Sequence, residues 1–274
     1  MSDKIVAIVF PFDLFGSSGT SAGAQLLGDA LRELIADNRQ EKRTTRSQAY
    51  QDRLKVRECH FETIDELTDW RKRGRSLIRS ALKNGEFVLW LSGNHLGVLP
   101  VYEELGVDTT VVQFDAHLDV YNLHDCTEEL SHGNFLLHAE TKLPSIVQIG
   151  HRDLILTNEY RDEHFKQCFS VDEISCDFDG VVKQLEKLRK VERLWIDIDC
   201  DVFDPVYFPA VTQRQPFGLM PQQMLRMLNA VWSPKVCGVS ISEYEPGRDD
   251  QDRSLALLVW LIEWMMLKRC EELR

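Results

Sequence analysis

Short apolar runs rich in β-branched and aromatic residues recur along this chain, and stretches with helical periodicity lie between several of them. The runs occupy residues 5–10, 56–61, 87–91, 109–114, 145–149, 193–198 and 236–241. Alternation of strands with helices is typical of a parallel sheet that has helices on both faces. The runs are mainly apolar rather than alternating, as expected for strands that are buried on both sides. We therefore predict an α/β fold.

The segments between the runs support this interpretation. Residues 22–35 and 221–231 have helical periodicity, and 254–270 is predicted to form a largely buried helix. Basic residues gather among acidic and polar ones in 38–57, which we interpret as a solvated helix or loop. With 274 residues, of which 43% are hydrophobic, and no linker rich in Pro, Gly or Ser, we expect one domain over residues 1–274.

Composition excludes several classes of function. The formal net charge of -12 disfavours a nucleic-acid partner and mildly favours a cationic ligand. The first residues lack the features of a signal peptide, and the apolar stretch 255–267 is too short for a membrane span, so we expect no membrane insertion. The seven cysteines form no C-x-x-C pair, which indicates a reducing compartment, and we expect a cytoplasmic protein.

Polar residues follow four of the predicted strands where each apolar run ends. The segments are 92–95 (SGNH), 115–119 (DAHLD), 199–205 (DCDVFDP) and 243–246 (EYEP). Open α/β sheets bind ligands outside the carboxyl ends of their strands, so these segments are expected to meet. A spacing of i, i+2, i+4 places three donors on one side of an extended segment. The candidate metal ligands are His95, Asp115, His117, Asp119, Asp199 and Asp201.

Each of these segments has a structural alternative when taken alone. D-x-H-x-D could be a surface turn, and D-x-D before Asp-Pro could be a turn or a helix cap. Together, so many carboxylates at the ends of apolar strands would burden a fold that offered no positive partner. Imidazole and carboxylate donors suit divalent manganese better than a structural zinc ion. The sequence therefore predicts a metal centre.

The motifs resemble those of the ureohydrolase superfamily, which includes arginases and agmatinases, from about residue 16 to residue 256. Residues 114–119 match its F-D-A-H-x-D motif, 131–133 match S-H-G, 199–205 match D-x-D-x-x-D-P and 243–246 match E-x-x-P. Residues 16–19 are similar to its glycine-rich opening loop. The resemblance implies a doubly wound, three-layer α/β/α fold whose mostly parallel sheet has about eight strands.

The resemblance also implies a binuclear manganese centre, with two Mn²⁺ ions per chain. His95, Asp115, Asp119 and Asp199 would hold one ion, and His117, Asp115, Asp199 and Asp201 would hold the other. Asp119 would accept a hydrogen bond from the attacking water. Glu243 would face a guanidinium group, and His132 would shuttle protons. The family further suggests a homo-oligomer.

Departures from the family pattern affect the metal site and the substrate. Asn94 stands where the family usually has aspartate, and Asp197 stands where it commonly has serine. Tyr121, Cys126 and Glu128 occupy positions where arginases grip the amino-acid head group. Ile155 likewise falls near the position where an amino-binding aspartate would lie. Free arginine is thus disfavoured, and we favour an arginine side chain within a peptide, bound partly through Tyr121, over agmatine or a similar small guanidino compound.

Two other classes of function remain open from the sequence. A deacetylase-like metal amidohydrolase could share this architecture, although the bridging pair and Glu243 argue against it. An inactive regulatory homologue could keep the fold without activity, although all six candidate ligands are present. The expected activity is hydrolysis of a guanidino C–N bond with release of urea.

Overall fold

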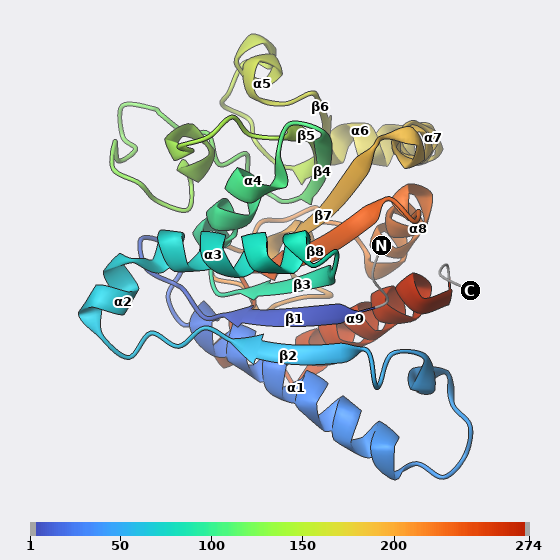
Figure 1. The fold of residues 1–274 in the computed structure, drawn as a ribbon. Helices are drawn as coiled ribbons and strands as arrows, with labels where there is room; N and C mark the ends of the chain where they lie inside the picture. Colours follow the sequence, from blue (N-terminus) through green and yellow to red (C-terminus); the bar gives the residue numbers. More distant parts are fainter. Residues whose placement is uncertain (1–3, 272–274) are drawn as a thin grey trace.

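Eight strands form one sheet in the computed structural model, which describes residues 4–271 (Figure 1). The sheet order is β2-β1-β3-β8-β7-β4-β5-β6, and every neighbouring pair is parallel. The strands are β1 (Ile5–Phe10), β2 (Leu54–Glu58), β3 (Phe87–Ser92), β4 (Thr109–Phe114), β5 (Ser145–His151), β6 (Gln167–Ser170), β7 (Arg193–Asp199) and β8 (Val236–Ser242). The prediction of a doubly wound α/β fold is confirmed.

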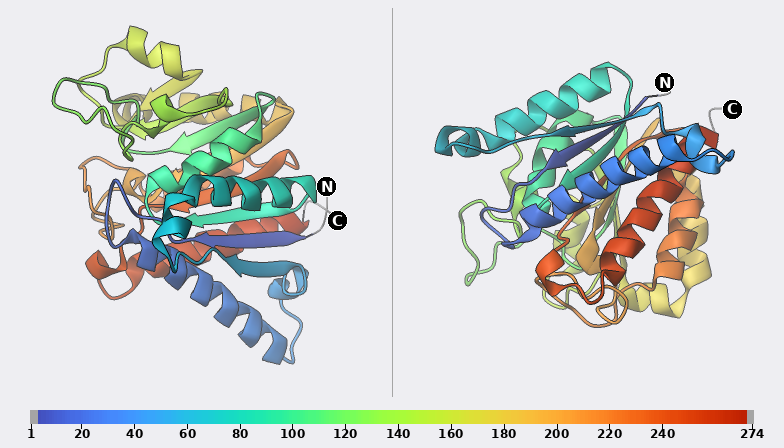
Figure 2. Two further views of the ribbon diagram at one scale, coloured as in Figure 1. Left: turned by 60° about the vertical axis from the view of Figure 1, so that its left-hand side comes forward. Right: turned by 90° about the horizontal axis from the view of Figure 1, so that it is seen from below.

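Helices cover both faces of the sheet, as Figure 2 shows in its right-hand view. One layer contains α1 (Thr20–Gln40), α6 (Val171–Cys176), α7 (Phe178–Glu186), α8 (Pro221–Val231) and α9 (Arg253–Glu271). The other contains α2 (Ile64–Thr68), α3 (Trp70–Lys83), α4 (Leu99–Leu105) and α5 (Asn158–His164). Short 3-10 helices are η1 (Arg46–Ala49), η2 (His95–Val98), η3 (Phe135–His138), η4 (Lys187–Lys190), η5 (Cys200–Val202) and η6 (Pro246–Arg248). Within residues 4–271, no helix is both long and apolar enough to cross a membrane.

Strand β1 shows why the apolar runs do not alternate with polar residues. Ile5, Ala7 and Val9 belong to the core beneath α1 and α9, whereas Ile8 and Phe10 belong to the core beneath α3 and α4. Successive side chains of a strand point to opposite faces, so a strand covered on both faces must be apolar throughout. Each such aliphatic side chain contributes roughly 1.5 to 3 kcal/mol when fully buried.

The sequence predictions differ from the structure mainly at the sheet edges. The segment 38–57, interpreted as a solvated helix or loop, contains the end of α1, the helix η1 and the first residues of β2, so that interpretation is wrong at its end. Edge strand β2 begins with buried Leu54 and exposed Lys55, a pattern that a search for apolar runs does not detect. The four-residue edge strand β6 was not predicted, because Gln167 and Ser170 interrupt its apolar character.

The four strands that carry the polar segments are neighbours in the sheet. Strands β3, β8, β7 and β4 lie side by side, although their order along the chain is different. Their registers align Leu91 with Ile241, Ile241 with Ile198, and Ile198 with Phe114. The strands therefore end at one level, and the loops that follow them emerge together.

Candidate metal centre

The candidate ligands converge at the carboxyl ends of these four strands. His95 opens η2 after β3, and the segment 115–119 follows β4 directly. Asp199 is the last residue of β7, Asp201 lies in η5, and Glu243 follows β8. All except His117 are almost fully buried. Segments far apart in the sequence thus supply one compact cluster of imidazoles and carboxylates.

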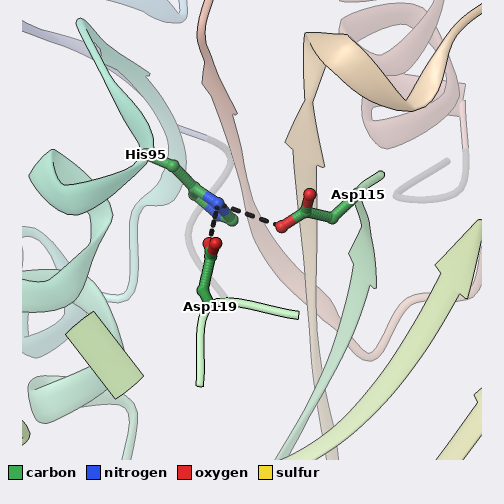
Figure 3. A group of neighbouring side chains, drawn as sticks. All are labelled: His95, Asp115 and Asp119. Atoms are coloured by element: carbon green, nitrogen blue, oxygen red, sulfur yellow. Dashed lines mark ion pairs between the residues drawn. The ribbon is translucent and has the colours of Figure 1, made fainter. Parts of the chain in front are cut away.

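His95 lies at the centre of the first half of this cluster. Its Nδ1 atom is 2.7 Å from Asp119 Oδ2, 3.1 Å from Asp115 Oδ2 and 3.2 Å from Asp199 Oδ2. Figure 3 shows the imidazole pointing between the first two carboxylates. Both Nδ1 and Asp119 Oδ2 are buried without a hydrogen-bond partner of good geometry. Because buried polar atoms are normally satisfied, this arrangement fits a cation held between them.

His117 forms the second half of the cluster. Its Nδ1 atom is 2.9 Å from Asp201 Oδ2 and 3.8 Å from Asp115 Oδ1. Asp115 therefore offers one oxygen toward each histidine. Two groups, His95 with Asp115 and Asp119, and His117 with Asp115 and Asp201, each bring their ligand atoms within 4.8 Å of one another. This donor set fits two divalent ions such as Mn²⁺ that share Asp115.

The protonation of the cluster reflects an excess of negative charge. Burial, reinforced by Asp119, raises the pKa of Asp115 to about 7. Burial and the neighbouring Asp201 raise the pKa of Asp199 well above its usual range. Burial alone would lower the pKa of His117, but Asp201 raises it to about 10. Burial alone would raise the pKa of Asp201, but His117 lowers it. The raised pKa values of Asp115, Asp199 and His117 indicate a site that needs added positive charge.

Two site residues have a left-handed backbone that non-glycine residues rarely adopt. Asp119 has φ 53° and Glu243 has φ 64°. Such conformations cost about 1 to 3 kcal/mol each and persist only where the surroundings enforce them. The Glu243 N–H donates to Gly93 O at 2.8 Å, and Glu243 Oε1 accepts the His95 N–H at 2.9 Å. The fold therefore fixes the carboxylate of Glu243 against the His95 loop.

His132 reaches the site from the long loop between β4 and β5. Its Nδ1 atom is 3.4 Å from Glu243 Oε1, and its backbone N–H donates to Phe15 O at 3.1 Å. A Cβ at Gly16 would lie 2.7 Å from His132 Cγ, so only glycine allows this close approach. Burial lowers the pKa of His132, but the contact with Glu243 outweighs it and leaves the pKa above its usual value. The imidazole is suited to carry a proton.

The cluster residues other than Asp115 line a cavity of about 490 Å³. Tyr121, the remaining predicted site residue, lines the wall of this cavity and also that of an adjoining cavity of about 390 Å³. Tyr121 is half-buried, and its pKa is raised by burial and by Asp153, so the phenol stays neutral. Phe15, which is 59% exposed, also lines the larger cavity, so its opening reaches the surface.

Several residues that the sequence did not indicate contact the predicted ligands. Gln215 Nε2 lies 2.7 Å from His117 Nε2, and Gln213 Nε2 lies 3.3 Å from His132 Nε2. Arg152 donates to the backbone oxygens of Asp201 at 2.6 Å and of Val202 at 3.0 Å. The signals that could have found them were a basic residue directly after a buried strand and the polar run at residues 212–215.

The two departures noted in the sequence have different structural roles. Asn94 donates to Leu14 O at 2.9 Å and so holds the glycine-rich loop. Asp197 is fully buried, and its Oδ2 lies 2.8 Å from His95 Nε2 and 2.6 Å from the Tyr102 hydroxyl. The carboxylate that contacts the far side of His95 therefore comes from Asp197.

Comparison with known proteins agrees with this geometry. A sequence profile described as the Arginase family matches residues 3–267. The chain belongs to the arginase family. A mitochondrial arginase of Medicago truncatula is 30% identical over 184 residues, which are 62% of this chain and 52% of that protein. The chain spans about half the length of the curated relatives it matches.

Solved structures with this fold include enzymes that are named for different activities. An agmatine ureohydrolase of Thermoplasma volcanium superposes with a TM-score of 0.78 at 23% identity, covering 97% of this arginase-family chain and 89% of the other. A formimidoylglutamase of Bacillus subtilis superposes with a TM-score of 0.74 at 19% identity, covering 98% and 87%. At these identities the similarity establishes the fold, and the substrate must be argued from the site.

Proposed function

We propose that this arginase-family protein is a binuclear-metal hydrolase that splits a guanidino C–N bond and releases urea. One observation carries the proposal. Three histidines and an excess of buried carboxylates, drawn from four adjacent strands and one loop, face a common cavity. In this proposal His95, Asp115, Asp119 and Asp199 hold one ion, while His117, Asp115, Asp199 and Asp201 hold the other, preferably as Mn²⁺. Residues 1–274 act as one catalytic domain in a reducing, cytoplasmic environment.

The metal ions supply one part of the chemistry and the protein supplies the rest. Two divalent ions, when bound, make water a nucleophile near neutral pH. Asp119 lies at the cavity floor with a carboxylate oxygen free of hydrogen-bond partners, and it accepts a hydrogen bond from the attacking water. Glu243 binds the planar guanidinium through charge-assisted hydrogen bonds, which hold its central carbon over the cluster.

His132 completes the reaction by handling the proton of the leaving amine. Burial lowers the pKa of His132, but Glu243 raises it and so favours the protonated form, and the cavity exposes the imidazole to substrate. A general acid must lie within hydrogen-bond reach of the atom that it protonates, directly or through one water. His132 lies beside Glu243, which holds the guanidinium, so the leaving nitrogen falls within this reach.

We further propose that the substrate is an arginine side chain within a peptide, which the enzyme converts to ornithine. Among the described residues, no lysine or arginine lines either cavity, so the α-carboxylate of a free amino acid would lack a cationic partner. A peptide has no such carboxylate at the arginine residue. Tyr121 and Phe15 offer apolar surface along the path from the cluster to the outside.

A small guanidinoalkylamine such as agmatine is the second candidate. Glu128 lines the adjoining cavity, which shares Tyr121, Cys126, Thr127 and Asn134 with the larger one. A carboxylate at this place could bind the distal ammonium group of such a compound. The two candidates differ in whether the far end of the substrate is cationic.

Urea release from a substrate panel tests the proposal. Chelated and then Mn²⁺-loaded protein is incubated with free arginine, agmatine, other guanidino acids, arginine-containing peptides and acetyl-lysine peptides. Asp199→Ala serves as the control for contaminating activity. Release from peptides alone supports the peptidyl substrate, and release from agmatine alone replaces it with the second candidate.

Other outcomes would contradict the guanidino assignment itself. Acetate release from acetyl-lysine peptides, without urea, would establish the deacetylase-like alternative. No product from any compound, although two ions are bound, would favour an inactive regulatory homologue.

A further inference from the structure

The two histidines of the cluster face the candidate metal positions through Nδ1 but differ in what lies behind them. His95 Nε2 contacts a carboxylate oxygen of Asp197 at 2.8 Å. His117 Nε2 contacts the side-chain amide of Gln215 at 2.7 Å. A carboxylate accepts a hydrogen bond from an imidazole N–H more strongly than an amide oxygen does, because the carboxylate carries a full negative charge. The centre is therefore asymmetric in its supporting contacts.

Asp197 accepts hydrogen bonds from several donors. The Tyr102 hydroxyl donates to its Oδ2 at 2.6 Å, and the Ser240 hydroxyl donates to its Oδ1. Ser240 in turn accepts the Trp195 Nε1–H at 3.0 Å. All four of these residues are fully buried. The network fixes the carboxylate in position and directs its Oδ2 at His95.

Gln215 is a weaker and more exposed support. His117 points its Nδ1 at Asp201 and Asp115, so with a metal ion at Nδ1 its Nε2 would carry the proton. The Gln215 amide must then turn its oxygen toward Nε2, since its nitrogen could only oppose a second donor. Gln215 is half-buried and lies on a loop, where its backbone oxygen accepts from Arg152 at 3.3 Å.

Arg152 adds to the difference between the two positions. Its guanidinium donates to Asp201 O, beside the carboxylate that faces His117. A fixed positive charge next to a cation site opposes the second ion. The contacts behind the His95 position bring a negative charge, whereas those behind the His117 position bring a neutral amide and a nearby cation.

We infer that the metal centre fills in two unequal steps, with the ion at the His95 position held more tightly because Asp197 backs that histidine. Asp197 is a positioning residue, since it acts through His95 and touches no substrate. The inference rests on the binuclear centre of the proposed function. Partners behind metal-ligating histidines typically change metal affinity by about 10- to 100-fold, so the loss of the Asp197 charge should weaken the tight step by that factor.

Stepwise Mn²⁺ binding to chelated protein, measured by isothermal titration calorimetry without substrate, tests this inference. We expect two resolved steps for the wild-type protein. Asp197→Asn keeps the shape and removes the charge, so it should weaken the tight step about 10- to 100-fold and leave the weak step unchanged. Gln215→Glu places a carboxylate behind His117. It should therefore raise the Mn²⁺ affinity of the weak step and reduce the difference in affinity between the two steps.

Gln213→Glu is the matched control. It introduces the same charge two residues away, beside His132 rather than behind a metal-facing histidine, and should leave the ratio of the two steps unchanged. Folding of Asp197→Asn is judged by circular dichroism and thermal unfolding. If it does not fold, Gln215→Glu still tests whether a charge behind a metal-facing histidine sets the affinity of that metal position.

Three results would overturn the inference. They are two equal steps in the wild-type protein, equal weakening of both steps by Asp197→Asn, and an unchanged weak step in Gln215→Glu. The measurement does not depend on turnover. A protein that binds two ions unequally but releases no urea would retain the inference while the proposed substrate chemistry failed, and a protein that binds no ion would remove both.

Discussion

Two groups of charged side chains in this protein follow opposite rules. Between α3 and α4, and the loop after η3, three arginines face three glutamates, and we call this set the helix charge group. At the carboxyl ends of the central strands, six carboxylates face three imidazoles and one guanidinium, and we call this set the carboxylate group. The helix charge group comprises Arg71, Arg75, Arg79, Glu103, Glu104 and Glu140. The carboxylates of the second group are Asp115, Asp119, Asp197, Asp199, Asp201 and Glu243.

The helix charge group is balanced within itself. Arg71 Nε donates to Glu103 Oε2 at 3.0 Å, and the Glu140 N–H donates to Glu103 Oε1 at 2.7 Å. Glu104 Oε1 accepts from Arg75 Nε and its Oε2 accepts from Arg79 Nε, both at 2.8 Å. The carboxylate group instead leaves ring and carboxylate atoms unpartnered. A group in which positive and negative charges balance needs no ligand, whereas an excess of negative charge indicates a cationic ligand that neutralises it.

The largest expected effect comes from Asp199→Ala in the carboxylate group. It removes a ligand proposed to serve both ions, so kcat/KM for urea release should fall at least about a thousandfold, or about 4 kcal/mol of transition-state stabilisation. The metal-free variant should be no less stable than the metal-free wild-type protein, because one of several repelling carboxylates is gone. Steady-state kinetics and urea denaturation after chelation measure the two effects. Full activity in this variant would refute the assignment of Asp199.

Glu103→Ala tests the balanced group. The glutamate side chain has no exposed surface, and its loss leaves Arg71 without its main partner. We expect the free energy of unfolding to fall by about 3 kcal/mol, with metal binding and turnover per folded molecule unchanged. Denaturant titration and kinetics at low temperature provide the check. A selective loss of metal binding would show that the two groups are coupled.

The pH dependence of stability should have opposite signs for Asp115 in the carboxylate group and for Glu104 in the helix charge group. The raised pKa of Asp115, about 7, means that its contribution is complete below its unfolded value and is lost as pH rises toward 7. Hydrogen bonding to Arg79 lowers the pKa of Glu104, so its contribution is present above its unfolded value and is lost on acidification.

Unfolding of chelated protein between pH 4 and pH 7.5 tests these signs. Asp115→Asn should flatten the decline toward pH 7, and Glu104→Gln should flatten the decline below about pH 4.5. Mn²⁺ competes with protons for the carboxylates, so its stabilising effect should grow with pH. If the stabilisation by Mn²⁺ did not change between pH 4 and pH 7.5, the result would contradict an excess of negative charge in the carboxylate group.

The smallest expected effect belongs to Gln213→Ala at the rim of the cavity. The side chain is exposed and reaches His132 at 3.3 Å, so it supports the proton-handling residue only weakly. We expect a reduction of kcat/KM by a few-fold, about 0.5 to 1.5 kcal/mol, without a change in stability or metal content. A loss comparable to that of Asp199→Ala would mean that Gln213 binds the substrate directly.

Much of the fold could be predicted from the sequence, because in the central strands the local hydrophobic pattern agrees with the position of each strand in the sheet. Residues 5–10 and 109–114 are buried on both faces and form mainly apolar runs, and their observed bounds match those predicted. The edge strands β2 and β6 have one neighbour each and tolerate polar residues, so apolar runs did not reveal their bounds. The candidate ligands and Glu243 could be predicted from the sequence because they follow apolar runs.

The sequence by itself determined the parallel α/β class, the six candidate ligands and their separation into segments at strand ends. Those features depend on hydrophobic patterning and on local spacing, both of which are encoded along the chain. Only the tertiary structure decided which side chains stand behind the ligands. Asp197 and Gln215 reach the two histidines across 102 and 98 residues of sequence. Such contacts depend on strand order and loop path, which residue spacing does not record.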